Sequence, residues 1–134
     1  MSLPTFATLI NNKVVTQQGD SPSYSVDQHF FQTCMATLLN MVQVDEAWYL
    51  AAYPDVAEAL KAGQLADCKA HFVWFGYYEH RMPRPIEVDE AWYLKVYPDI
   101  EKAVERQAFA SGQDHFNRCG YSEGRMPYAN FSLA

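Results

Sequence analysis

The sequence predicts an all-α, mainly helical protein that contains two tandem 44-residue repeats of three helices each. The segment VDEAWYL at residues 44–50 returns unchanged at residues 88–94. The same offset continues without a gap, so that residues 44–83 and 88–127 are identical at 20 of 40 aligned positions. Apolar residues in both copies fall at helical spacing, and a fixed period of this length is typical of helical repeat proteins.

Residues 1–43 lie outside the repeat. Phe6–Ile10 and Val14–Thr16, separated by the turn residues Asn11 and Asn12, predict a short β-hairpin. Ser25 with Gln28 forms a capping-box pattern ahead of a helix that we expect to cover the end of the repeats. The apolar positions assigned to that helix are Val26, Phe30, Cys34, Leu38 and Met41.

Each repeat is expected to form three short helices. Asp45 suits the N-cap of the first helix, and Pro54 suits the first turn of the second, which Gly63 closes. The third is expected to end at Gly76 in copy one and at Gly120 in copy two, with both glycines as left-handed C-caps. The predicted organisation is a hairpin and capping helix at 1–43, repeats at 44–87 and 88–127, and a tail at 128–134, all in one compact domain.

Charge and composition narrow the classes of partner. The chain has 10 Lys and Arg against 16 Asp and Glu, a net charge of −6. Without a basic cluster, nucleic-acid binding is not expected, and without an apolar run of about 20 residues, neither is membrane insertion. The N-terminal residues have no secretory-signal pattern, so the expected location is cytoplasmic. The three cysteines have unrelated spacings and are expected to be buried thiols, with no disulfide framework and no cofactor.

The repeated motif resembles a short helical repeat of bacterial proteins. Its pattern here is Y-L-x-x-Y-P-D, then H-F, then G-Y-x-E-x-R-M-P, against a usual form close to Y-L-x-x-N-P-D-V, H-Y-x-x-x-G and E-G-R-x-P. That repeat accompanies glycosyltransferases of polysaccharide synthesis and large surface proteins of the haemolysin type. The resemblance covers residues 44–127 and implies an all-α accessory module near surface polysaccharides, without catalytic or binding residues.

Charged residues recur in the loop that ends each copy. An arginine in such a loop can fork onto a carboxylate, phosphate or uronic acid of a ligand, or onto a carboxylate of its own chain. The expected internal partner is the aspartate at the start of the second helix. The residues concerned are Glu79, Arg81 and Asp55 in copy one and Glu123, Arg125 and Asp99 in copy two.

Histidines recur as well. His71 and His115 are expected to be packing residues that hydrogen-bond the following loop, the alternative being general acid–base groups. A metal site at His71, Glu79 and His80 lacks a recognised ligand spacing, so no metal is expected. Ser122 lies in a G-x-S-x-G sequence, but without the preceding strand that a nucleophile elbow needs.

Most repeated aromatic residues are assigned to the core. Trp74, Tyr78 and Arg84 differ between the copies and are therefore the expected exposed contacts, with Arg81 and Arg125 as further binding candidates. The function expected from these features is a non-enzymatic interaction module that binds a protein partner or forms a homodimer. Two alternatives stay open, a glycan-binding accessory module and a small hydrolase or transferase with a histidine–carboxylate site.

Overall fold

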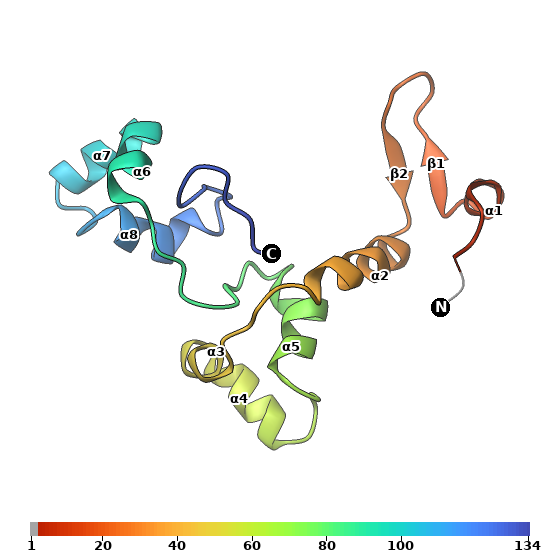
Figure 1. Cartoon of the computed structure of the whole chain (residues 1–134), viewed down its shortest axis with the longest axis horizontal. Helices are drawn as coiled ribbons and strands as arrows, with labels where there is room; N and C mark the ends of the chain where they lie inside the picture. Colours follow the sequence, from red (N-terminus) through yellow and green to blue (C-terminus); the bar gives the residue numbers. More distant parts are fainter. Residues whose placement is uncertain (1–2) are drawn as a thin grey trace. The chain divides into compact units, whose positions relative to one another are not determined.

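The computed structural model describes residues 3–134, and the chain divides into two compact units, Met1–Asn40 and Met41–Ala134 (Figure 1). The described residues are mostly helical and contain one two-stranded antiparallel sheet. The first unit contains α1 (Phe6–Asn11), β1 (Val15–Gln17), β2 (Tyr24–Val26) and α2 (Gln28–Leu39). The second contains α3 (Glu46–Ala52), α4 (Pro54–Lys61), α5 (Cys68–His71), η1 (Phe72–Gly76), α6 (Glu90–Val96), α7 (Pro98–Glu105), α8 (Gly112–His115) and η2 (Phe116–Gly120).

The predicted strand at Phe6–Ile10 is wrong, because these residues form helix α1. Thr5 is its N-cap, and its hydroxyl accepts a hydrogen bond from the Thr8 amide at 3.2 Å. The helix is followed by Lys13 in the left-handed region, at φ 57°. The hairpin therefore forms later in the chain, where β1 pairs with β2 in the register Val15↔Val26.

The predicted capping box of helix α2 is also wrong. Ser25 lies in β2 opposite Thr16, and the N-cap is Asp27, whose carboxylate accepts from the Phe30 amide at 3.0 Å. Because Val26 belongs to the strand and does not begin the helix, the predicted apolar stripe is misplaced. Cys34, Leu38 and Met41 are exposed, and the buried residues of α2 are Ala36 and Leu39.

The helix starts predicted at Asp45 and Pro54 are confirmed, and the second copy repeats them. Asp45 and Asp89 cap α3 and α6, accepting from the Trp48 and Trp92 amides at 3.0 and 3.1 Å. Helices α4 and α7 begin at Pro54 and Pro98, where a missing amide hydrogen costs no helical bond. Gly63 follows α4 in the left-handed region at φ +71°.

The third helix of each copy ends in a π-helical turn. In η1 the Tyr77 amide donates to the Phe72 carbonyl five residues earlier, at 2.9 Å. Gly76 and Gly120 belong to these turns and are not left-handed C-caps, which corrects the expectation. A Cβ at either position would collide with a tyrosine hydroxyl, so close approach requires glycine there. The left-handed residues come later, at His80 and Gly124.

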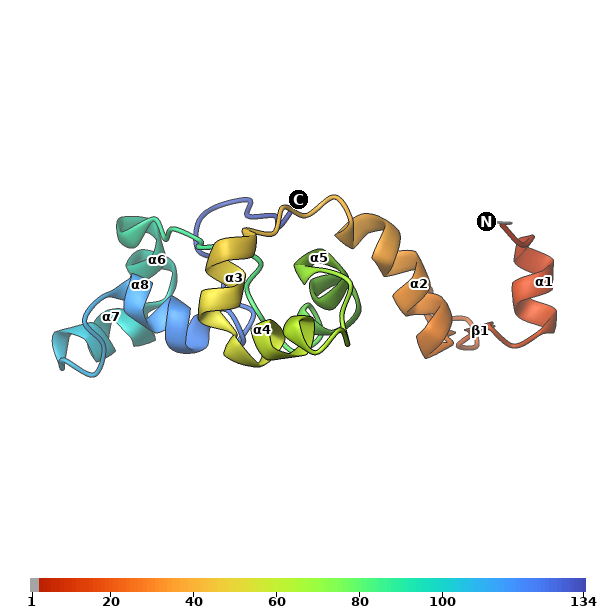
Figure 2. The ribbon, with the colours of Figure 1, turned by 90° about the horizontal axis from the view of Figure 1, so that it is seen from below.

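Two small cores organise the second unit. In the first copy α3 contacts both α4 and α5, and in the second copy α6, α7 and α8 contact one another (Figures 1 and 2). Each contains a fully buried tyrosine and phenylalanine, Tyr49 with Phe72 and Tyr93 with Phe116. The end of each copy returns to its start, since the Pro83 and Pro127 carbonyls accept from the Asp45 and Asp89 amides, both at 3.0 Å.

Cysteine burial differs from the expectation of three buried thiols. Cys68 is buried, Cys119 is half-buried and Cys34 is exposed. No helix among residues 3–134 has the length and apolarity needed to cross a membrane.

Candidate functional site

The loop after η1 carries an arginine that is held on three sides. Arg81 forks onto Asp55 at the start of α4, with Nη1–Oδ1 and Nη2–Oδ2 distances of 2.8 and 2.7 Å. Its Nε donates to Glu79 at 2.7 Å, and the guanidinium lies 5.0 Å from the centre of the Tyr53 ring. The planar fork thus joins the loop to the second helix with bidentate geometry.

The second copy repeats this cluster. Arg125 forks onto Asp99 at 3.0 and 2.7 Å, donates to Glu123 at 2.9 Å, and lies 4.8 Å from the centre of the Tyr97 ring. Both arginines therefore make the internal pair that was one of the two alternatives. Because both guanidinium groups are already paired with aspartates of the chain, neither is free to bind the carboxylate or phosphate of a ligand.

Hydrogen bonding between these groups moves their pKa values. The arginine hydrogen bonds lower the pKa of Asp55 and of Asp99 below the usual aspartate value. The aspartate hydrogen bonds raise the pKa of Arg81 and of Arg125. Both pairs are consequently ionised across the physiological range.

A tyrosine hydroxyl also fixes each loop. The Met82 amide donates to Tyr53 Oη at 2.8 Å, and the Met126 amide donates to Tyr97 Oη at 2.8 Å. Because these tyrosines end α3 and α6, each loop is bound to both the first and the second helix of its copy. Backbone and side-chain contacts together therefore tie each loop to the helices of its own copy.

The repeated histidines are bonded to tyrosines and not to the following loops, which corrects the expected partner. Tyr49 Oη lies 2.9 Å from His71 Nδ1, and Tyr93 Oη lies 2.9 Å from His115 Nδ1. The histidines are only 8% and 3% exposed. Burial lowers the pKa of both imidazoles and raises the pKa of Tyr93 to about 12. These imidazoles are neutral, and their burial does not support general acid–base catalysis on a substrate.

The candidate contacts that differ between the copies have different surroundings. Trp74 is 43% exposed, as expected for a contact residue, and adjacent Phe75 is 53% exposed. Tyr78 was expected to be exposed, but it is half-buried and its hydroxyl is buried without a hydrogen-bond partner among residues 3–134. The surface feature is therefore the pair of exposed aromatic residues Trp74 and Phe75, neighbours in sequence, which is named the aromatic patch.

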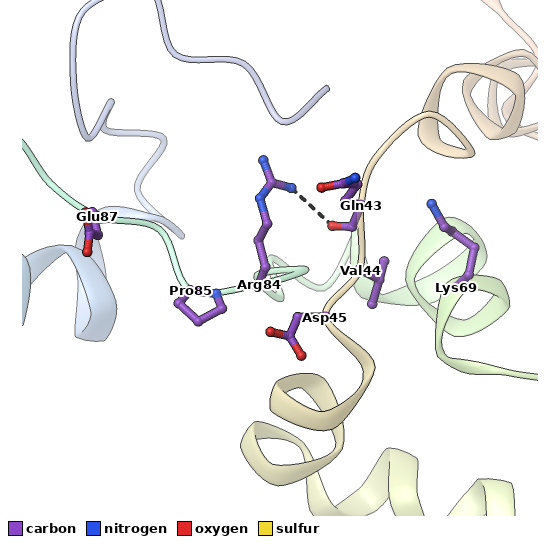
Figure 3. A pocket seen from close by; sticks show the side chains of 7 residues that line it. All are labelled: Gln43, Val44, Asp45, Lys69, Arg84, Pro85 and Glu87. Atoms are coloured by element: carbon purple, nitrogen blue, oxygen red, sulfur yellow. Dashed lines mark hydrogen bonds between the residues drawn. The ribbon is translucent and has the colours of Figure 1, made fainter.

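Arg84 borders a hollow of about 800 Å³ at the junction between the copies (Figure 3). Its guanidinium donates to the Gln43 and Leu133 carbonyls, each at 3.1 Å, and Lys69 donates to the Val42 carbonyl. Two acidic residues balance these cations. The lining residues are Gln43, Val44, Asp45, Lys69, Arg84, Pro85 and Glu87. The hollow thus carries no net charge that would select an anion.

A second hollow, of about 300 Å³, lies between Trp48, Met82 and Gln113. The side-chain amide of Gln113 accepts a hydrogen bond from the backbone N–H of Val88 at 2.8 Å and donates one to the Ile86 carbonyl at 2.9 Å. The side chain of Gln113 is therefore already hydrogen-bonded to the segment between the copies, so it is not available to bind a sugar in this hollow.

Ser122 does not have the setting of a catalytic serine. It follows η2, and its hydroxyl donates to the Cys119 carbonyl at 2.8 Å. A cluster that no sequence motif predicted lies next to Ser122, where ligand atoms of His115, Cys119 and Glu123 are within 4.8 Å of one another. Their spacing of four and four residues is the signal that could have found it.

Comparison with protein-family models, curated proteins and solved structures gives no match.

Proposed function

We propose that residues 44–127 are two helical repeats that act as a non-enzymatic interaction module and bind a protein partner through Trp74 and Phe75. The resemblance of the motif to accessory repeats of bacterial surface systems suggests a partner in polysaccharide synthesis or at the cell surface. The observation that carries the proposal is the contrast between repeated and non-repeated positions.

The repeated polar residues serve the fold. The arginines hold aspartates, the histidines hold tyrosines, and the glycines accommodate tyrosine hydroxyls. The exposed residues that differ between the copies are therefore the candidates for contacts with a partner. At the position of exposed Trp74 the second copy has Arg118, so the scaffold itself does not need an indole there.

The chemistry of the patch favours a protein over a glycan. Two exposed aromatic residues, neighbours in sequence, offer apolar area, and Trp is enriched where protein interfaces concentrate their binding energy. Glycan binding also needs polar groups beside the ring, and the repeated cation of this copy, Arg81, is held by Asp55 and Glu79. Glycan binding is the second candidate, since a single exposed indole can still stack on a sugar ring.

Affinity capture with the full chain tests the proposal. Trp74→Arg gives copy one the residue that copy two carries, so the fold is expected to tolerate it. Val96→Ala is the matched control, because Val96 is 44% exposed and Trp74 is 43% exposed. We expect a stoichiometric protein from a lysate of the source organism to bind the wild type and Val96→Ala, and binding to Trp74→Arg to fall at least tenfold.

Four outcomes would contradict the proposal. Capture of no protein, or of a protein that Trp74→Arg retains equally, removes the role of the patch. Enrichment of glycan without protein assigns the patch to sugar stacking. Sedimentation that shows a dimer dissociated by Trp74→Arg makes a second copy of the chain the partner.

A further inference from the structure

One group of three potential metal ligands lies in the second copy. His115 ends α8, Cys119 lies in η2 and Glu123 lies in the turn that follows. The four-residue spacings bring the three side chains to the same side of this helical segment. Among residues 3–134, this is the group of three His, Cys or acidic residues whose ligand atoms all lie within 4.8 Å of one another.

Their separation suits coordination better than direct hydrogen bonding. His115 Nε2 lies 3.7 Å from Glu123 Oε2, which is longer than a hydrogen bond. Zinc–ligand bonds of about 2.0–2.3 Å in a tetrahedron place neighbouring ligand atoms about 3.3–3.8 Å apart. The nitrogen and oxygen already have this spacing, and the sulfur needs at most a side-chain adjustment of about 1 Å to reach it.

Neighbouring residues orient two of the three ligands. With Nδ1 of His115 protonated and donating to Tyr93 Oη at 2.9 Å, Nε2 presents its lone pair toward Glu123. Such outer hydrogen bonds fix the tautomer and ring orientation of metal-binding histidines. Burial also lowers the pKa of His115, which favours the neutral form that binds metal.

The carboxylate is oriented as well. Arg125 Nε donates to Glu123 Oε2 at 2.9 Å, which orients the carboxylate and leaves the second lone pair of Oε2 for the ion. The positive charge of Arg125 is balanced by its fork onto Asp99, and Arg118 is paired with Asp114 at 3.3 Å. Neither guanidinium therefore presents an uncompensated charge to a cation.

The first copy provides an internal comparison. His71 and Glu79 occupy the corresponding positions, but Phe75 replaces the cysteine. The Phe75 ring lies 5.8 Å from the His71 ring, and the sulfur ligand is missing. Only the second copy thus combines nitrogen, sulfur and oxygen ligands at these positions.

We propose that His115, Cys119 and Glu123 bind one divalent transition-metal ion of the zinc type, with water as the fourth ligand. Imidazole, thiolate and carboxylate together suit zinc, which accepts all three in a tetrahedral site. Cys119 is half-buried, so part of this residue is open to solvent. On binding, its thiol proton passes to the solvent and the ion ties η2 to the turn that holds Arg125. This site is independent of the proposed protein-binding patch.

Calorimetric titration of the full chain with zinc chloride tests the site, and the cobalt(II) complex reports thiolate ligation through its charge-transfer absorption. We expect one ion per chain. Cys119→Phe, which installs the residue of copy one, should lower the association constant at least 100-fold and abolish the thiolate band. Cys34→Ser is the matched control, because Cys34 is the exposed thiol, and it should leave binding unchanged. Tyr93→Phe should weaken binding about tenfold by removing the outer hydrogen bond.

Glu123→Gln guards against a folding defect in Cys119→Phe, because Glu123 is exposed and glutamine keeps the shape of the side chain. It should also lower the association constant at least tenfold, with an unchanged circular dichroism spectrum. The proposal is overturned if the wild type shows no saturable zinc binding, if Cys119→Phe binds as tightly as the wild type, or if Cys34→Ser abolishes binding.

Discussion

The buried tyrosine–histidine pair of the first copy allows a sharp test of the fold. Tyr49→Phe removes one hydroxyl and keeps the ring, which is fully buried. His71 Nδ1 then loses its partner at 2.9 Å inside the core. A buried polar group left without a hydrogen bond costs about 1–3 kcal/mol, so we expect a loss of about 2 kcal/mol in the free energy of unfolding. Domains of this size are stable by about 5–15 kcal/mol, and the variant should therefore still fold.

Urea unfolding monitored by tryptophan fluorescence measures this loss. All three tryptophans lie in the Met41–Ala134 unit, so the signal follows this unit alone. The midpoint should fall at an unchanged slope, since the surface exposed on unfolding is the same. Tyr128→Phe is the matched control because Tyr128 is exposed, and it should change the free energy by less than about 0.5 kcal/mol. A loss below about 0.5 kcal/mol for Tyr49→Phe at pH 7.5 would refute the structural role of the pair.

Three further predictions use the same assay. Burial lowers the pKa of His71 and His115, so the unfolded chain binds protons that the folded chain does not. Stability should therefore fall as the pH drops below about 6.5, by up to about 1.4 kcal/mol per pH unit for each histidine; a flat profile between pH 7.5 and 5 contradicts this. His80→Gly should stabilise the chain by about 0.5–1 kcal/mol, because His80 has a left-handed φ of 59°. Gly124→His should destabilise it by a similar amount, and unfolding midpoints equal to that of the wild type would contradict both expectations. Gly120→Ala should cost about 1–3 kcal/mol, because its Cβ meets a buried tyrosine hydroxyl, and a neutral effect would mean that the helix moves aside freely.

Much of the second unit could be predicted because its signals are local. An aspartate that caps a helix bonds to an amide three residues away, and a proline sets its own φ angle. Asp45 and Pro54 therefore mark helix starts without reference to the rest of the chain. The fork of Arg81 onto Asp55 was also one of the stated alternatives, since the same charges recur at the same spacing in copy two.

The first unit was predicted less well because competing local signals lie close together. Ser25 matches a capping box, but its backbone pairs with Thr16 in the sheet, and Asp27 takes the cap. Phe6–Ile10 has strand-like composition, yet the hydroxyl of Thr5 caps a helix there. A pattern read from one segment does not weigh the hydrogen bonds that another segment offers.

The sequence by itself determined the mainly helical class, the duplication at residues 44–127 and the helix starts at Asp45 and Pro54, since composition and periodicity carry this information. Only the tertiary structure decided which side chains meet. Tyr49 and His71 are 22 residues apart, and Gly76 is needed because that tyrosine's hydroxyl lies against it. Such contacts depend on how helices pack in three dimensions, and the number of residues between two positions does not determine how far apart they lie when they are on different helices.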